Sequence, residues 1–246
     1  MHNPNDTSPA TSGASLPGAP SGDSLPGSEP SERAAIPSLT SAVDAMLRQP
    51  QRVLNLLSDA RPGPLIARLL MSSVLCSLIY GVVVGTFSGG AQLWAAPVKI
   101  AAGLVLSALI CLPSLYIFAC LSGAQARPAQ VWGLVAGLLT LMNILLIGFA
   151  PVAWVFSQST ESVALMGALH LLFWAVATAF GLKFLCAGFS HLNARSESGW
   201  KVWVVIFVMV TLQMTTALRP LIGTSPHFLP PEKKFFLVHW RECLSQ

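Results

Sequence analysis

The chain has 246 residues, of which 53% are apolar and only 10% are Asp, Glu, Lys or Arg, whereas about 25% of an ordinary soluble domain is charged. Together with a mean hydropathy of +0.64, this composition excludes a water-soluble globular protein. The formal net charge is +4, but nucleic acid is not expected as a partner because no basic patch with interleaved aromatic residues lies on a soluble segment. We therefore predict an all-α, multi-pass helical protein whose partner is the lipid bilayer.

Residues 1–38 are dominated by Ser, Pro, Gly, Ala and Thr and contain no Phe, Trp or Tyr. Such a segment buries too little apolar surface to offset the conformational entropy lost on folding. It also lacks the basic region and the apolar region of a signal peptide. We predict a disordered cytosolic tail that is able to recruit protein partners.

The segment 39–62 shows helical periodicity. Ser41 and Asp44 have the spacing of a capping box at the start of a first helix. Pro50 suits the first position of a second helix, whose apolar face would consist of Val53, Leu54 and Leu57. Two interpretations stay open: residues 39–60 lie on the membrane surface or dock a protein partner, or they form a helical segment packed on the protein's own loops.

Long uncharged apolar runs follow, each close to the roughly 20 residues that a helix needs to cross a bilayer. We place five transmembrane helices, within a domain 63–222, at 65–87, 95–121, 131–157, 163–188 and 201–222. Their short connections require consecutive helices to run antiparallel as neighbours. Tryptophan side chains favour the headgroup region, and five lie near the predicted span ends: Trp94, Trp132, Trp154, Trp200 and Trp203. Trp174 lies nearer the middle of a span and is interpreted as a packing residue.

The basic residues indicate the orientation. Arginines precede the first span, and Arg127, Arg195 and Lys201 lie in loops on the same side. The positive-inside rule therefore predicts a cell-membrane protein with a cytoplasmic N-terminus. The C-terminal tail, 223–246, contains Phe, Trp and Lys residues and is interpreted as an interfacial anchor; an outer-side binding element or a sixth membrane element are the alternatives.

Polar residues inside the predicted spans are the candidates for function, because charge is costly in hydrocarbon. The candidate cluster consists of Lys99, Asn143, His170, Gln213 and Arg219, with Glu161 at its rim. Counted from the span ends, Lys99, His170, Gln213 and Arg219 belong to the outer half of the bilayer. In one interpretation they form an outer-side polar cavity with His170 as its titratable member. In the other, Lys99 and Arg219 snorkel to the surface, while Asn143, His170 and Gln213 form hydrogen bonds between helices.

Small residues and prolines mark packing positions within the spans. Gly81, Gly85 and Gly89 repeat every fourth residue, as do Gly133 and Gly137. This spacing allows helices to approach closely, within one subunit or between the subunits of a homo-oligomer. Pro113 and Pro151 each remove a backbone hydrogen bond, so a kink is expected at each.

The sequence contains no GxSxG, HExxH or P-loop motif, and its few acidic residues are not paired for general acid and base catalysis. No Cys or His spacing matches a zinc site. We therefore expect no catalytic residues, no metal and no cofactor.

Several short motifs are typical of one group of membrane proteins: Tyr80 to Gly89, Lys99, Leu112 to Tyr116, Gly123 and Ala150-Pro151. Over residues 65–190 they resemble bacterial members of the Yip1-like group of five-span membrane proteins. The resemblance implies a cytoplasmic N-terminal region, five helices, a C-terminus on the opposite side and no enzymatic activity. We expect a non-enzymatic scaffold or adaptor that recruits partners at the membrane. The alternative is a transporter or channel subunit with an outer-side polar cavity around His170.

Overall fold

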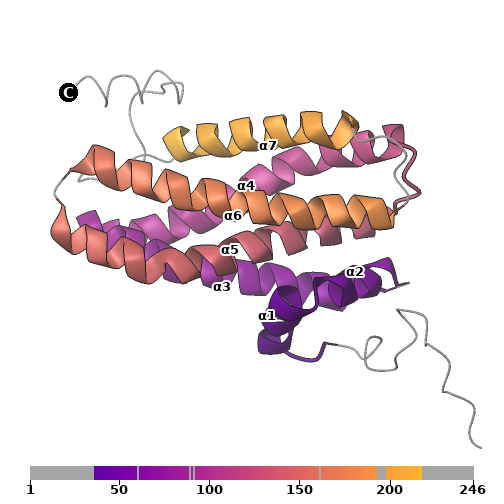
Figure 1. The fold of residues 1–246 in the computed structure, drawn as a ribbon, viewed down its shortest axis with the longest axis horizontal. Coiled ribbons are helices and arrows are strands. Elements are labelled where there is room, and N and C mark those ends of the chain that lie inside the picture. The colour runs from indigo at the N-terminus through magenta and orange to yellow at the C-terminus, as the bar shows by residue number, and fades with distance from the viewer. Residues whose placement is uncertain are drawn as a thin grey trace, which may run out of the picture. The chain divides into compact units, whose positions relative to one another are not determined.

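The structure is a computed structural model that describes residues 36–59, 61–88, 90, 92–160, 162–192 and 198–217. All regular elements in these ranges are helices (Figure 1). In chain order they are α1 (Leu39–Arg48), α2 (Pro50–Ser58), α3 (Gly63–Ser88), α4 (Gln92–Leu121), α5 (Pro128–Ser159), α6 (Val163–His191) and α7 (Ser198–Ala217). The all-helical prediction is therefore confirmed. The predicted disordered tail, except for 36–38, and the predicted tail at 223–246 lie outside the described residues.

Four helices, α3 to α6, are long and apolar enough to cross a membrane, and their ends lie within three residues of the predicted bounds. The prediction of a fifth complete span is wrong for the described residues. The apolar part of α7 extends only from Lys201 to Met214, which corresponds to about 20 Å at 1.5 Å per residue. This length is shorter than the roughly 30 Å of a bilayer's hydrocarbon. The structure thus supports four crossings rather than five.

Local hydrogen bonds and prolines determine where several helices begin. The Ser38 hydroxyl accepts a hydrogen bond from the Ser41 N–H at 3.1 Å and caps α1. The predicted capping box at Ser41 and Asp44 is therefore wrong, because Asp44 lies a full turn inside the helix and pairs with Arg48. Pro50 begins α2, as predicted.

The beginnings of α5 and α6 follow the same chemistry. The Arg127 N–H donates to Oε1 of Gln130 at 2.9 Å, and Pro128 is the first residue of α5. The Ser162 hydroxyl accepts from the Leu165 N–H at 3.3 Å at the start of α6. Between α4 and α5 the chain turns through Gly123, whose φ of 76° is accessible to glycine without strain.

The contacts between the long helices give the order α6, α5, α3, α4, α7. Successive long helices of the chain run antiparallel (Figure 1). The most extensive contact is between α3 and α5, which are not consecutive. The prediction that consecutive spans pack as neighbours is therefore wrong for α6 and α7, and α4 and α5 share only a small contact. α5 is the most buried of the four long helices, because it packs against α3 and α6 and also contacts the two short helices, α1 and α2. The hydrophobic core therefore centres on α5.

Helices α1 and α2, which we call the α1–α2 unit (Leu39–Ser58), pack against the long helices of the same chain. α1 contacts α3 and α5, and α2 contacts α5, α3 and α6. Their apolar faces are buried, including Met46, Val53, Leu54 and Leu57. The predicted apolar face of the second helix is thus confirmed. Of the two interpretations, packing within the chain is the one that the structure shows, although the contacts are with the long helices and not with loops.

Glycines allow several of these close approaches. A Cβ on Gly81 would collide with the backbone of Pro97, so α3 and α4 approach closely at this position. A Cβ on Gly133 would collide with Leu57, and one on Gly137 would collide with Phe184 and approach Met46. Gly85 is buried, and Gly89 lies outside the described residues. The described contacts of Gly81, Gly133 and Gly137 are therefore contacts within one chain.

Candidate functional site

Lys99 is located in α4, where its side chain is only 1% exposed. The expectation that Lys99 snorkels to the membrane surface is therefore wrong. The close contact between Gly81 and Pro97, half a turn earlier in α4, holds this part of α4 against α3. Lys99 consequently lies within the bundle and does not extend along its lipid-facing surface.

Asn143 joins α5 to α3. Its Nδ2 donates to the hydroxyl of Ser73 at 2.8 Å and to the backbone oxygen of Leu139 at 2.9 Å. One turn earlier in α5, the single hydroxyl hydrogen of Thr140 is shared between the backbone oxygens of Leu69 in α3, at 2.8 Å, and Ala136 in α5, at 2.7 Å. Hydrogen bonds between membrane helices stabilise their association by about 0.6 kcal/mol on average. Asn143 therefore acts as part of a polar connection between the two most closely packed helices.

His170 joins α6 to α3. Its Nδ1 lies 2.7 Å from the hydroxyl of Tyr80, and the two rings meet edge to face. The imidazole and the phenol are both donors and acceptors, so the tautomer of His170 decides which one donates. In the described part of the chain, Nε2 of His170 is buried without a hydrogen-bond partner.

The contacts of α3 relate the predicted cluster residues to one another. Gly81 contacts Pro97, two residues before Lys99, and the neighbouring Tyr80 bonds to His170. Lys99 and His170 therefore lie at similar heights along the bundle, toward the end where α6 begins. Asn143 bonds to Ser73 instead, which lies two turns before Tyr80 in α3. Gln213 is half-buried in α7, and Arg219 and Glu161 lie outside the described residues.

The partners of these residues could not be identified from the sequence. Ser73, Tyr80 and Thr140 contribute to hydrogen bonds that join α3 to α5 and α6, but each is a residue type that is common in membrane helices. The sequence does contain one pattern of polar residues in this region. His170, Trp174 and Thr178 lie four residues apart, which predicts that the three side chains share one face of a helix.

The tryptophans differ in their environments. Trp94 is 80% exposed and Trp154 is also exposed, and both lie toward the end of the bundle where α4 begins and α5 ends. Trp174 is half-buried against the core, in agreement with its interpretation as a packing residue. Trp203 is fully buried, and its Nε1 donates to the backbone oxygen of Cys111 at 2.9 Å. The prediction of an interfacial Trp203 is therefore wrong, because α7 packs on α4 and covers it.

Trp132 is half-buried near the start of α5, and the side chain of Trp200 lies outside the description. Pro113 and Pro151 lie inside α4 and α5, which continue through both positions. The kinks that we expect at these prolines stay predictions.

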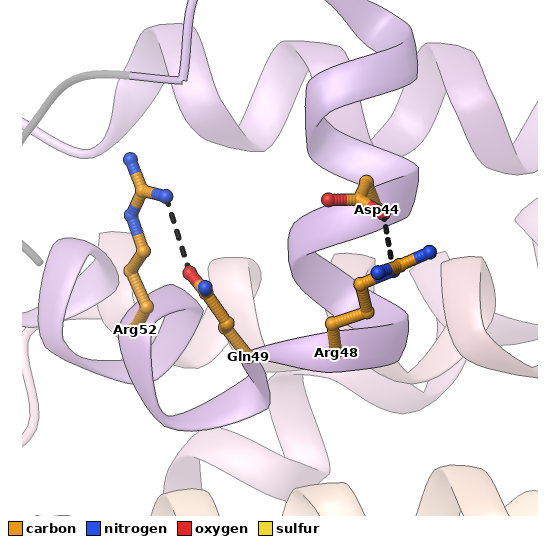
Figure 2. Close-up of polar contacts among 4 residues, drawn as sticks. All are labelled: Asp44, Arg48, Gln49 and Arg52. Carbon is orange, nitrogen blue, oxygen red and sulfur yellow. Dashed lines mark hydrogen bonds and ion pairs between the residues drawn. The ribbon is translucent and has the colours of Figure 1, made fainter. Parts of the chain in front are cut away.

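The outer face of the α1–α2 unit is polar. Arg48 Nε lies 2.8 Å from Asp44 Oδ1, and both side chains are well exposed. A guanidinium nitrogen of Arg52 donates to Oε1 of Gln49 at 3.2 Å. Figure 2 shows these two contacts side by side across the junction of α1 and α2. An exposed ion pair contributes at most about 1 kcal/mol, so Asp44 and Arg48 can exchange this contact for one with another partner at little cost.

An open cleft of about 420 Å³ lies beside these contacts. The buried side chain of Ile36 forms part of its wall, and Thr40, Asp44, Gln49 and Arg52 supply polar groups. The carboxylate accepts hydrogen bonds, the guanidinium donates them, and the hydroxyl and the amide do both. The cleft, which we call the α1–α2 cleft, therefore has the donors and acceptors that a polar protein segment requires.

The described basic residues lie mainly toward one end of the bundle, which we call the basic end: the end where α3, α5 and α7 begin. There lie Arg48, Arg52, Arg61, Arg68, Arg127 and Lys201, and Lys183 lies in the half of α6 nearer to it. Lys99 is the one described Lys or Arg residue that lies toward the opposite end. The described Lys and Arg residues are thus distributed unevenly along the bundle, and the described acidic residues, Asp44 and Asp59, also lie at the basic end.

The described residues contain no group of three or more His, Cys, Asp or Glu side chains arranged to hold a metal ion. Comparison with protein-family models, with curated proteins and with solved structures finds no significant match to this chain. The resemblance to the Yip1-like group gains no support from these comparisons and stays a prediction. What the structure shows is a polytopic helical protein of the membrane-spanning type, with a polar cleft on its short helices and polar contacts between its long ones.

Proposed function

We propose that the protein is a non-enzymatic membrane scaffold whose α1–α2 unit recruits a protein partner. One observation carries the proposal: the apolar faces of α1 and α2 are buried against the long helices, while the polar face with its cleft points outward. A short amphipathic helix pair held in this way presents a fixed polar surface, so little side-chain and backbone entropy is lost when a partner binds.

The uneven distribution of Lys and Arg supports a cytoplasmic location for this surface. The α1–α2 unit lies at the basic end, and loops rich in Lys and Arg stay on the cytoplasmic side of a cell membrane. We infer that the basic end faces the cytoplasm. Residues 1–35, the predicted cytosolic tail, are a second candidate segment for recruiting partners.

Photo-crosslinking from the cleft tests this function. A photoreactive amino acid at Thr40, which lines the cleft, is expected to form a discrete adduct with one protein in native membranes. The same amino acid at Gln51, an exposed position of α2 that does not line the cleft, is the matched control. The adduct from Thr40 is expected to disappear when Asp44→Ala and Arg52→Ala are combined, because the cleft then loses its charged acceptor and donor.

Two results would contradict the scaffold. One is equal adduct formation from Thr40 and Gln51, which would indicate random collisions. The other is an adduct from Thr40 that persists when both charged groups are removed.

The alternative function, a transporter or channel subunit, is favoured by the Tyr80 and His170 contact, with its unpartnered imidazole nitrogen. Histidine is the side chain that changes charge near neutral pH, and ionisable residues within spans often mark ion or proton paths. In reconstituted vesicles, a transporter is expected to show pH-dependent flux that is lost in His170→Ala and in Lys99→Met. Flux that persists in both folded variants, or its absence in the unmodified protein, would exclude this function.

A further inference from the structure

Three polar side chains form a row along α6: His170, Trp174 and Thr178. They are four residues apart and therefore lie on one face, with a rise of about 6 Å between neighbours. His170 Nε2, Trp174 Nε1 and Thr178 Oγ1 are each buried and have no hydrogen-bond partner within the described chain. We call these residues the α6 polar row.

The row lies at a depth where unpaired polar groups are costly. At 1.5 Å per residue, His170 is about 10 Å and Thr178 about 22 Å from the start of α6. The row therefore extends to the middle of a helix that is long enough to cross a membrane. A buried polar group without a partner costs about 1–3 kcal/mol in a protein interior, and lipid offers no replacement for the missing hydrogen bonds.

The chemistry of the row favours a small ligand that both accepts and donates hydrogen bonds. The indole N–H of Trp174 only donates. If Tyr80 donates to Nδ1 of His170, Nε2 carries the hydrogen and donates as well. The Thr178 hydroxyl can do either. Water meets all of these requirements, and buried water molecules typically bond to polar groups of this kind.

The packing indicates where such a path begins and ends. His170 is half-buried and lies nearest to the start of α6, whereas Thr178 is 3% exposed. Just beyond Thr178, a Cβ on Gly181 would lie 2.9 Å from Cγ of Met142 and 3.2 Å from the backbone oxygen of Leu138. The helices α5 and α6 are therefore in direct contact at this level, which leaves no room for a ligand between them beyond Thr178.

We propose that the α6 polar row lines a narrow water path, which enters the bundle at the end opposite the basic end and terminates at Thr178. The path goes beyond the scaffold function and does not depend on it. In a scaffold it is a hydrated pocket, and in a transporter it is half of a route across the membrane.

The test is the reaction of introduced cysteines with a charged, membrane-impermeant methanethiosulfonate reagent. The chain carries five cysteines, which are first replaced by serine or alanine. Thr178→Cys changes the side chain little, so folding is expected to be retained. Because thiols react as thiolates, which form in water and not in hydrocarbon, Thr178→Cys and Trp174→Cys are expected to be labelled.

Two neighbouring positions serve as controls. Leu172 is 57% exposed on the lipid-facing surface of α6, and Ala177 is completely buried in the packed core. Leu172→Cys and Ala177→Cys are expected to remain unlabelled. Adding His170→Phe, which places an apolar ring at the entrance, is expected to abolish the labelling of Thr178→Cys.

Three outcomes would overturn the path: no labelling of folded Thr178→Cys, equal labelling of Ala177→Cys, or labelling from the basic end only. A lipid occupying the row would give the first of these outcomes, because the charged reagent would not reach the thiol. None of the three depends on the photo-crosslinking result from the α1–α2 cleft.

Discussion

Replacing Trp203 by alanine is expected to lower the free energy of unfolding by about 3–5 kcal/mol, the range for removing a buried aromatic side chain. Trp203 is completely buried and stacks on Phe207 with ring centroids 5.1 Å apart. Its Nε1 also donates to the backbone oxygen of Cys111 in α4. The substitution removes the packing and the hydrogen bond together, and α7 contacts the other long helices mainly through α4.

The measurement is denaturation of the purified protein in detergent, followed by circular dichroism. Trp94→Ala is the matched control, because Trp94 is exposed and its loss leaves no cavity. Trp203→Phe separates the two contributions: it retains most of the packing and is expected to cost about 1 kcal/mol for the lost hydrogen bond. A Trp203→Ala variant as stable as Trp94→Ala would show that α7 does not depend on this contact.

The positions of the four long helices could be predicted because each is a long uncharged apolar run between turn residues. A helix in lipid satisfies its own backbone hydrogen bonds, so a long uncharged apolar run predicts a span where the helix is also long enough. The run at 201–222 failed this length condition, because the apolar part of α7 covers only Lys201–Met214. Pro50 and the apolar spacing of Val53, Leu54 and Leu57 also predicted α2 correctly. These features depend on residues that are close in the sequence.

The remaining features depend on contacts between distant residues. Trp203 lies near the start of α7, where a tryptophan usually meets headgroups, and only the packing of α7 on α4 shows that it is buried. One of the two interpretations of Lys99 placed its ammonium group at the surface by snorkelling. The side chain is buried instead, and its direction depends on how α4 meets α3. The depth of His170 could be counted along the sequence, but its pairing with Tyr80 required the structure.

Asp44 illustrates the same limit on a smaller scale. Its spacing from Ser41 fits a capping box, yet the helix begins three residues earlier than this motif requires, at Ser38. Ser38, and not Ser41, caps the helix: its hydroxyl accepts a hydrogen bond from the Ser41 N–H and also contacts the Ser41 hydroxyl. Asp44 is thereby left on the outer face, where it lines the α1–α2 cleft.

Replacing Leu57 by alanine is expected to release the α1–α2 unit from the long helices without unfolding them. Leu57 is 2% exposed, and its methyl group occupies the space that Gly133 leaves open on α5. Loss of a buried leucine side chain costs about 2–5 kcal/mol. Because the unit has few contacts with the long helices compared with those among the long helices themselves, the cost appears as local opening.

Limited trypsin digestion measures this opening, since cleavage at Arg48 and Arg52 requires the unit to unfold locally. Proteolysis follows the population of the open state, and a cost of 2 kcal/mol corresponds to cleavage about thirtyfold faster. Leu47→Ala is the matched control, because Leu47 lies in the same unit but is 52% exposed. Its cleavage rate is expected to equal that of the unmodified protein.

A compensating pair of substitutions tests the contact itself. Gly133→Ala places a Cβ where the Leu57 methyl group lies, so it is also expected to accelerate cleavage. In the double variant with Leu57→Ala, however, the new Cβ enters the space that the leucine side chain leaves. The double variant should therefore be cleaved more slowly than the sum of the two free-energy costs predicts. Strictly additive costs would mean that Leu57 and Gly133 do not meet, and the polar cleft would then lack its fixed support.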